Sequence, residues 1–290
     1  FAALPSTSHI PKRLLSRTLN AMSFSFLTMH LHENTATVIL SRPEKRNALS
    51  RVLLEELLQA FEDLLLQKSV RAVVLTGEGP TFCAGMDLKE MAETAKMSNP
   101  HEQWEKDARL YLELIETMLH FPKPIIAAVD GAAVAGGGGL VLASDIVIAS
   151  RNAKFGFPEP RRGIVAGIVS PLLYFRTSGA CAAYLLLTGS IVDADYVKRA
   201  GLVQEVVEAE QIWARARELA DECSLCAPEA IAMTKRMLNE TIGDSLNTML
   251  TTGAAISGTA RTTAAAKEGL AAFLEKRDPD WDYPNEDFEH

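Results

Sequence analysis

The sequence predicts an α/β fold of repeated strand–helix units, followed by a mostly helical C-terminal region. Short apolar runs alternate with amphipathic helical segments up to about residue 150. From residue 170 onward helical periodicity dominates, with breaks near Gly189, Gly201 and Pro228. Repeated β-α units imply parallel strands with right-handed crossovers, and their irregular spacing does not suit an eight-unit barrel. We therefore expect a spiral of stacked units.

Local sequence patterns predict the individual strands and helices. Residues 29–32 and 36–41 form two predicted strands, joined by a turn at Glu33-Asn34. Apolar residues at helical spacing predict a helix over residues 51–67, with Ser50 as its N-cap. The remaining predicted segments are strands at residues 72–76, 125–129, 145–149 and 153–157, a helix at 102–120 and a flexible surface segment at 91–101.

The composition is that of an ordinary globular protein, with 290 residues, 48% hydrophobic, and a net charge of −8. No apolar stretch reaches the roughly 18 residues that span a bilayer, so we expect a soluble protein without a membrane partner. The acidic charge and the lack of a basic cluster argue against a nucleic-acid partner. Cys223 and Cys226 have metal-ligand spacing but no second pair in the sequence, so no metal site is predicted.

The first 28 residues have a composition of their own. They contain Lys12, Arg13 and Arg17, several Ser and Thr, and no acidic residue. This resembles a mitochondrial transit peptide, although an extension outside the fold fits as well. We expect a cytoplasmic protein, or one of the mitochondrial matrix if residues 1–28 are a transit peptide. The predicted core covers residues 29–200 and the C-terminal helical region residues 201–290.

Four consecutive glycines, Gly136–Gly139, stand between a predicted strand and a helix-like run. Each glycine costs about 0.5–1 kcal/mol in regular structure relative to alanine, so the run needs a local reason. At a strand-to-helix junction that reason is the close approach of backbone N–H groups to an anion. The spacing is not that of a dinucleotide fingerprint, and Leu140-Val141 stands where a P-loop has Lys-Ser/Thr. An oxyanion formed during a reaction is the better hypothesis.

Gly85-Met86 forms a second turn of small residues that also follows a buried strand. Two such turns can aim one N–H each at a single carbonyl oxygen, and each donor is worth about 10²–10³ in rate. Two tight turns without a shared target remain the alternative. Glu159 lies between Pro158 and Pro160, which hold its backbone rigidly, so it is a candidate general acid/base. Its alternative is an ordinary surface-loop glutamate.

Together these segments resemble the crotonase family, the enoyl-CoA hydratase/isomerase superfamily, over about residues 29–281. The resemblance implies a spiral of ββα units, with the region 201–290 joining subunits into a homotrimer or a dimer of trimers. The segments that carry it are residues 41–49, 82–89, 123–131, the glycine run with Asp145, and residues 155–159, 187–189, 200–203 and 267–276.

The resemblance also implies an acyl-CoA thioester as substrate and a place in fatty acid metabolism. No separate cofactor is expected, because CoA belongs to the substrate. The amides of Met86 and Gly136 would hold the thioester oxygen, and Glu159 would be the catalytic carboxylate. The substrate-binding residues implied by position are Lys45, Ala84, Met86, Asp87, Leu88, Lys89, Gly136, Phe273 and Lys276.

One departure from the family pattern concerns Gly139, which stands where hydratases of the family carry a second glutamate. Two carboxylates let one orient water while the other handles the α-carbon proton. We expect a hydratase in which water or another polar group shares the work of Glu159. A delta-isomerase, an acyl-CoA hydrolase and a non-catalytic or RNA-binding homologue remain alternatives. Residues 91–101 and 164–171 should shape the acyl pocket. Arg161 and Arg162 are candidates to meet an acidic acyl group, but exposed surface arginines are the more common outcome.

Overall fold

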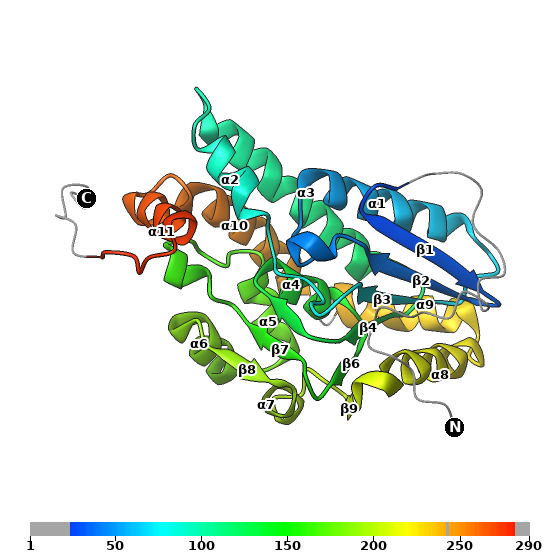
Figure 1. Ribbon diagram of the computed structural model, residues 1–290. Helices are drawn as coiled ribbons and strands as arrows, with labels where there is room; N and C mark the ends of the chain where they lie inside the picture. Colours follow the sequence, from blue (N-terminus) through cyan, green and yellow to red (C-terminus); the bar gives the residue numbers. More distant parts are fainter. Residues whose placement is uncertain (1–23, 242–243, 282–290) are drawn as a thin grey trace.

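The computed structural model describes residues 24–241 and 244–281, and a six-stranded sheet forms its centre (Figure 1). In spatial order the strands are β1 (Leu27–His32), β2 (Thr35–Leu40), β3 (Ala72–Gly77), β4 (Ile125–Val129), β6 (Ile146–Ser150) and β9 (Glu205–Val207). Within this sheet, as far as the structure describes it, only the β1–β2 pair is antiparallel and the other pairs are parallel. The carboxyl ends of β3 and β4 therefore open toward the same edge, where the glycine turns follow.

A second sheet of three short strands lies beside the first. Its strands are β5 (Ala132–Val134), β7 (Lys154–Gly156) and β8 (Ile191–Asp193). β5 follows β4 after a sharp turn at Gly131, whose φ is +71° and whose Cβ position is blocked by the Pro80 carbonyl. β7 follows β6 in the same way. Each pair thus gives one strand to each sheet before the chain continues, which is the predicted ββα spiral.

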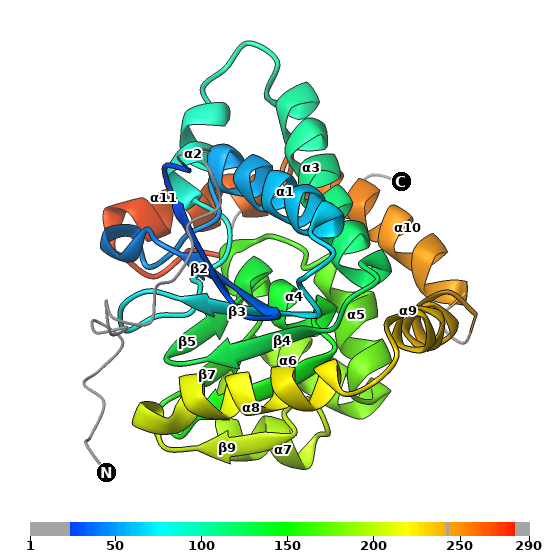
Figure 2. The same cartoon turned by 90° about the vertical axis from the view of Figure 1, so that its right-hand side faces the viewer.

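The helices cover both faces of the larger sheet. They are α1 (Arg51–Leu66), α2 (Leu88–Thr94), α3 (Pro100–His120), α4 (Gly136–Ala143), α5 (Val169–Arg176), α6 (Gly179–Thr188), α7 (Ala194–Arg199), α8 (Ile212–Ser224), α9 (Pro228–Arg236), α10 (Asp244–Ala260) and α11 (Ala264–Glu275). Short 3-10 turns are η2 (Pro43–Lys45), η3 (Glu159–Arg162) and η4 (Ala209–Gln211), and η5 (Met237–Thr241) is a π-helical turn. Figure 2 shows α8 on one face and α1 and α3 on the other.

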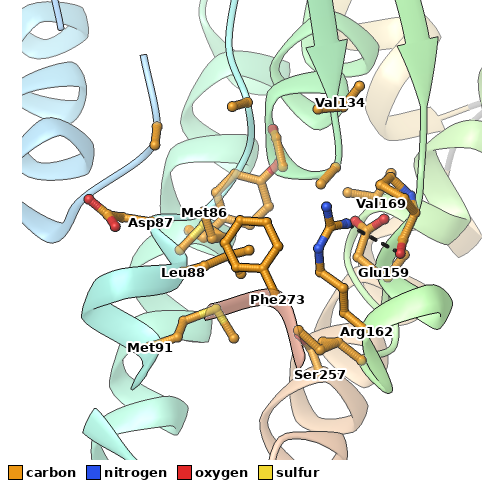
Figure 3. A pocket seen from close by; sticks show the side chains of 18 of the residues that line it. Met86, Asp87, Leu88, Met91, Val134, Glu159, Arg162, Val169, Ser257 and Phe273 are labelled. Carbon is orange, nitrogen blue, oxygen red and sulfur yellow. Dashed lines mark hydrogen bonds between the residues drawn. The ribbon is translucent and has the colours of Figure 1, made fainter. Parts of the chain in front are cut away.

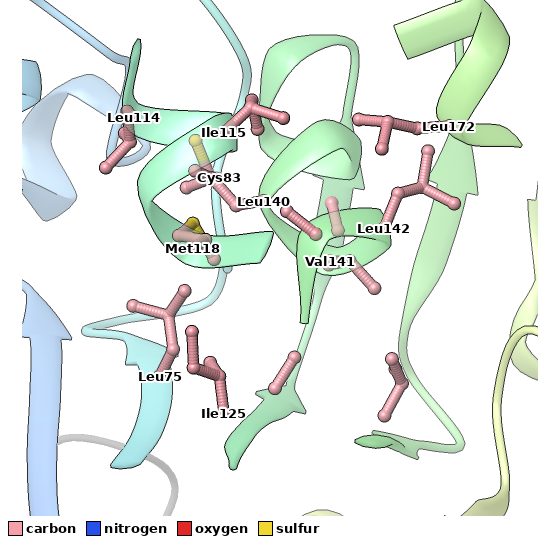
Figure 4. Close-up of a cluster of buried hydrophobic side chains, with 14 of the residues drawn as sticks. Leu75, Cys83, Leu114, Ile115, Met118, Ile125, Leu140, Val141, Leu142 and Leu172 are labelled. Atoms are coloured by element: carbon pink, nitrogen blue, oxygen red, sulfur yellow. The ribbon is translucent and has the colours of Figure 1, made fainter. Parts of the chain in front are cut away.

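The larger core lies between the sheet and α1, α3 and α4 (Figure 4). Leu75 and Ile125 rise from β3 and β4, while Leu114 and Met118 descend from α3; all four are fully buried. All eight residues of α4 are buried as well, so this helix has no polar face. A helix enclosed on every side holds its N-terminal residues in a fixed place, which matters because α4 begins with the glycine run.

Most of the predicted elements are confirmed. Ser50 caps α1 by accepting a hydrogen bond from the Leu53 amide at 3.2 Å, and the turn at Glu33-Asn34 joins β1 to β2. The flexible segment predicted at 91–101 is wrong in part, since α2 continues to Thr94 and α3 begins at Pro100. β8 and β9 lie in a region predicted to be helical. Three-residue strands are too short to show alternation, and neighbouring strands decide their conformation.

Two predictions concern the chain beyond the fold. Residues 1–23, most of the predicted extension, lie outside the described residues. Among the helices of the described ranges, none combines the length and the apolarity needed to cross a bilayer.

Candidate active site

The two turns that the sequence singles out lie against each other. The Val134 amide donates a 3.0 Å hydrogen bond to the Cys83 carbonyl, so the segments that lead into the turns run side by side. Gly85, with a φ of +87°, backs directly onto the other turn. A Cβ on Gly85 would lie 2.7 Å from Ala135 Cβ and 3.1 Å from the Gly136 nitrogen. Only glycine allows this approach, and it brings Met86 next to Gly136.

The backbone pairing around Met86 fixes the direction of its N–H group. Leu49 forms a parallel bridge with Met86, in which Leu49 N donates to Gly85 O at 2.8 Å and Asp87 N donates to Leu49 O at 3.0 Å. These bonds use the groups on either side of Met86, so its own N–H points away from Leu49. Gly136 opens α4, and its N–H is one of the four that a helix leaves without an intrahelical acceptor.

Ala135 carries backbone strain immediately before Gly136. Its φ of 52° and ψ of −128° lie outside the regions that residues with a Cβ favour, at a cost of order 1–3 kcal/mol. Hydrogen bonds hold this conformation: Ala135 N donates to Gly156 O at 2.9 Å, and Gly139 N donates to Ala135 O at 3.1 Å. The sharp reversal turns the Gly136 amide from the direction of β5 into the axis of α4.

Both turns open into a cavity of about 340 Å³ (Figure 3). Residues 164–169, the end of α10 and the end of α11 complete its walls. Lys276 is not among the lining residues; it caps the C-terminus of α11 in a left-handed conformation. All the other predicted site residues line this one cavity: Lys45, Ala84, Met86, Asp87, Leu88, Lys89, Gly136, Glu159 and Phe273.

Glu159 is the first residue of η3, and its carboxyl group is enclosed although the residue as a whole is partly exposed. Its Oε2 atom is buried without a hydrogen-bond partner among the described residues. Burial raises the pKa of Glu159 from 4.5 to about 7, opposed by its own backbone N–H and by the positive charge of Arg162. A carboxyl group that titrates near neutrality can both accept and return a proton.

The side chains of the two arginines that follow Glu159 lie in different places. Arg161 donates from Nε to the Thr188 carbonyl at 2.9 Å and does not line the cavity, so the prediction that it faces the acyl group is not supported by its position. Arg162 does line the cavity. Its guanidinium lies 5.2 Å from the centre of the Phe273 ring and acts on the charge of Glu159 (Figure 3).

Asp87 has partners within the chain. Its Oδ2 accepts a 2.8 Å hydrogen bond from Arg42 Nη1, and its Oδ1 caps α2 by accepting from the Lys89 amide at 3.0 Å. The carboxylate therefore positions the segment that carries Met86. The cations at the cavity mouth are Lys45, Arg46 and Lys89.

Tyr111 is a site residue that the sequence did not reveal. Its hydroxyl donates a 2.7 Å hydrogen bond to the Gly136 carbonyl, and it lines the cavity from α3. Burial raises the pKa of Tyr111 well above its usual value, and Cys83 and Glu159 in their ionised forms raise it further. A Cβ on Gly139 would collide with this hydroxyl. The phenol thus fills the space beside Gly139, where the family resemblance places a second glutamate.

The collision gives a first prediction, about packing. Gly139→Ala is expected to destabilise the protein by about 3 kcal/mol, as overpacked core substitutions do. In a Tyr111→Phe background the hydroxyl is gone, and the nearest atoms are the ring carbon Cζ and Val169 Cγ2, both 3.2 Å from the new methyl group. The same substitution should then cost only about 1 kcal/mol.

Urea unfolding of the four proteins in this double-mutant cycle measures the coupling between the two sites. Additive effects of the two substitutions would show that Tyr111 does not occupy this space in solution.

Comparison with known proteins places the chain in a family. The family model for enoyl-CoA hydratase/isomerase matches residues 31–284, and the chain belongs to this family. The crystal structure of an enoyl-CoA hydratase from Mycobacterium avium has a TM-score of 0.79 at 30% identity, covering 89% of this chain and 99% of that one. The crotonase-type fold expected from the sequence motifs is confirmed, and the chain is an enzyme of this family.

The relatives carry both hydratase and isomerase names. A Thermus thermophilus protein provisionally named enoyl-CoA hydratase is 38% identical over 85% of this chain and 96% of its own. The 2,3-dehydroadipyl-CoA hydratase of Escherichia coli is 33% identical over 89% and 98%. The 1,2-epoxyphenylacetyl-CoA isomerase of the same organism is 29% identical over 88% and 97%. Membership of the family therefore does not decide between hydration and isomerisation, and the choice between them has to come from the geometry of the site.

Proposed function

We propose that the protein adds water to a 2-enoyl-CoA thioester, using the Met86 and Gly136 amides and the single carboxylate of Glu159. The observation that carries this proposal is the meeting of three groups in one cavity. Met86 and Gly136 line it, and their N–H groups are used neither by the parallel bridge at Met86 nor within α4. The enclosed carboxyl group of Glu159, with a pKa of about 7, lines the same cavity.

In the proposed reaction the thioester oxygen sits between the two amides. Glu159, ionised, takes a proton from water while the water oxygen forms a bond to the β-carbon, and the electron pair of the double bond moves to the thioester oxygen. The amides stabilise the resulting enolate. Protonated Glu159 then gives its proton to the α-carbon as the carbonyl re-forms. One carboxylate completes both transfers, and water is added without any other reactant.

Tyr111 supplies the second polar contact for the water. Its hydroxyl gives its proton to the Gly136 carbonyl, so its lone pairs remain free to accept from water. Tyr111 and Glu159 line the same cavity, and the charge of Glu159 acts on Tyr111. The phenol would therefore orient water in the space where a second glutamate is missing. The cations Lys45, Arg46 and Lys89 at the mouth would hold the phosphates of CoA.

Isomerisation of a 3-enoyl-CoA to a 2-enoyl-CoA is the second candidate, because a single carboxylate suffices to carry a proton along the acyl chain. The family is named for both hydratases and isomerases, which keeps this candidate open. The two reactions differ in water uptake, so they are distinguished by their products.

The test is the conjugated-thioester absorbance of crotonyl-CoA after addition of the protein, with the product identified by mass spectrometry. Hydration is expected to remove the absorbance and to add the mass of one water molecule. A parallel assay offers 3-enoyl-CoA in the same buffer. The hydratase proposal fails if 2-enoyl-CoAs of several chain lengths keep their absorbance, and appearance of absorbance from 3-enoyl-CoA without added mass would establish the isomerase instead.

A further inference from the structure

A buried arginine without a partner stands at one end of the cavity. Arg261 directly follows α10, is only 7% exposed, and lines the cavity. Its Nε and Nη1 atoms are buried and lack a hydrogen-bond partner among the described residues. Buried cations are costly unless they are paired, so this guanidinium is set to receive an anion.

The acid closest in effect to Arg261 is already occupied. Asp107 acts on the charge of Arg261, but its carboxylate accepts hydrogen bonds from Arg51 Nε at 2.6 Å and from Arg51 Nη2 at 2.8 Å. Gln103 adds a third donor at 2.8 Å. The Asp107 carboxylate is therefore already bound to Arg51, and Arg261 is left with unused donors.

The position of Arg261 relative to the reacting groups follows from α3. Tyr111 contacts the Gly136 carbonyl, at the oxyanion end, and Asp107 lies one helical turn earlier, about 6 Å along the axis. Ala108 lines the cavity between these turns. Ser257, which stands one turn before Arg261 on α10, also lines the cavity and appears in Figure 3 near Arg162. The cavity therefore has a reacting end, an apolar stretch and a cationic end.

We infer that Arg261 binds a carboxylate at the far end of the acyl chain, so that the preferred substrate is the CoA thioester of a short unsaturated dicarboxylic acid. A guanidinium offers a carboxylate two parallel N–H donors when Nη2 acts together with either Nε or Nη1, and both Nε and Nη1 lack a partner here. The inference rests on the proposed function, since it assumes that an acyl-CoA occupies this cavity. The step of about 6 Å along α3 from Tyr111 to Asp107, the acid that acts on Arg261, suits an acyl chain of about four to six carbons.

The experiment measures binding without turnover, by calorimetry with saturated acyl-CoAs of equal chain length. Their acyl chains end in a carboxylate, a primary amide or a methyl group. The parent is expected to bind the carboxylate at least about tenfold more tightly than the amide. In Arg261→Met this ratio should fall to about one, and Arg261→Lys should retain part of it because a point charge replaces the bidentate pair.

Two matched variants separate this role from a general effect of removing a buried arginine. Arg176 is partly buried, with an Nη2 atom that lacks a partner among the described residues, but it does not line the cavity, so Arg176→Met should keep the parental ratio. Arg162→Met removes a second arginine that lines the cavity, and loss of the carboxylate preference in that variant in place of Arg261→Met would overturn the assignment. Thermal unfolding of each variant checks that it folds.

The affinities of the unsubstituted protein are enough to test the inference about Arg261. Equal affinity for the carboxylate and the methyl-ended thioester refutes it, even if crotonyl-CoA is hydrated. Selective binding of the carboxylate without hydration of any enoyl-CoA rejects only the hydratase proposal. If no acyl-CoA binds, both are rejected.

Discussion

Glu159→Gln is expected to lower kcat for hydration by at least about 10³-fold, within the range that general acid–base groups contribute. Glutamine keeps the size and shape of the side chain but cannot accept the proton of water or return one to the α-carbon. The two amides that hold the thioester are untouched, so the affinity for a saturated acyl-CoA should change by less than about threefold. Steady-state kinetics and calorimetry on the same preparation measure the two quantities.

The same substitution should also make the protein more stable at alkaline pH. The folded-state pKa of about 7 lies above the ordinary 4.5, so folding favours the protonated form. That stability is complete below pH 4.5 and is lost as the pH rises through 7, by about 3 kcal/mol in all. Glutamine carries no charge, so Glu159→Gln should gain about this much at pH 8 and little at pH 4.5.

If Glu159→Gln lowers activity and raises stability at pH 8, then Glu159 serves catalysis rather than folding. Urea unfolding of parent and variant at both pH values measures the second effect. Glu44→Gln is a suitable control, because Glu44 lines the same cavity but is well exposed. If Glu159→Gln lost activity and stability together at pH 8, Glu159 would have a structural role, and the mechanism would need another base.

The sequence predicted the parts of this site that depend on local backbone chemistry. A run of glycines, a glycine turn after a buried strand and a glutamate between prolines each restrict the backbone over a few residues. Their meaning is therefore visible without the fold. The structure confirms that these segments line one cavity, which their order along the chain suggested through the family resemblance.

The parts that the sequence missed depend on contacts between distant segments. Tyr111 lies on the same face of α3 as Leu114 and Met118, so helical periodicity identifies it only as a core residue. Arg261 follows a long helix and has no nearby acidic partner in the sequence. Nothing local distinguishes a hydroxyl that reaches Gly136 or a guanidinium left unpaired in a cavity, because both depend on how α3 and α10 pack.

Gly136→Pro is expected to lower kcat/KM by about 10²–10³-fold, the value of one oxyanion donor, because proline has no N–H. Proline is accepted at the first position of a helix, where that N–H has no intrahelical partner, so α4 should still form. The strained Ala135 precedes it, and residues before proline are restricted. A variant is therefore needed that changes the side chain and keeps the amide.

Gly136→Ala provides that comparison. A Cβ at this position would lie 3.4 Å from Leu49 Cδ1 and 3.6 Å from both Met86 Sδ and Tyr111 Cζ, which are ordinary contacts, and Gly136 does not have a positive φ. We expect the alanine variant to lose less than about tenfold in kcat/KM, with circular dichroism and thermal unfolding close to the parent for both variants. Equal activity of the two variants would exclude the Gly136 amide as a donor, since they differ in the presence of its proton. A loss of kcat/KM in the proline variant alone would show that the Gly136 N–H group is the part of the glycine run that acts on the thioester.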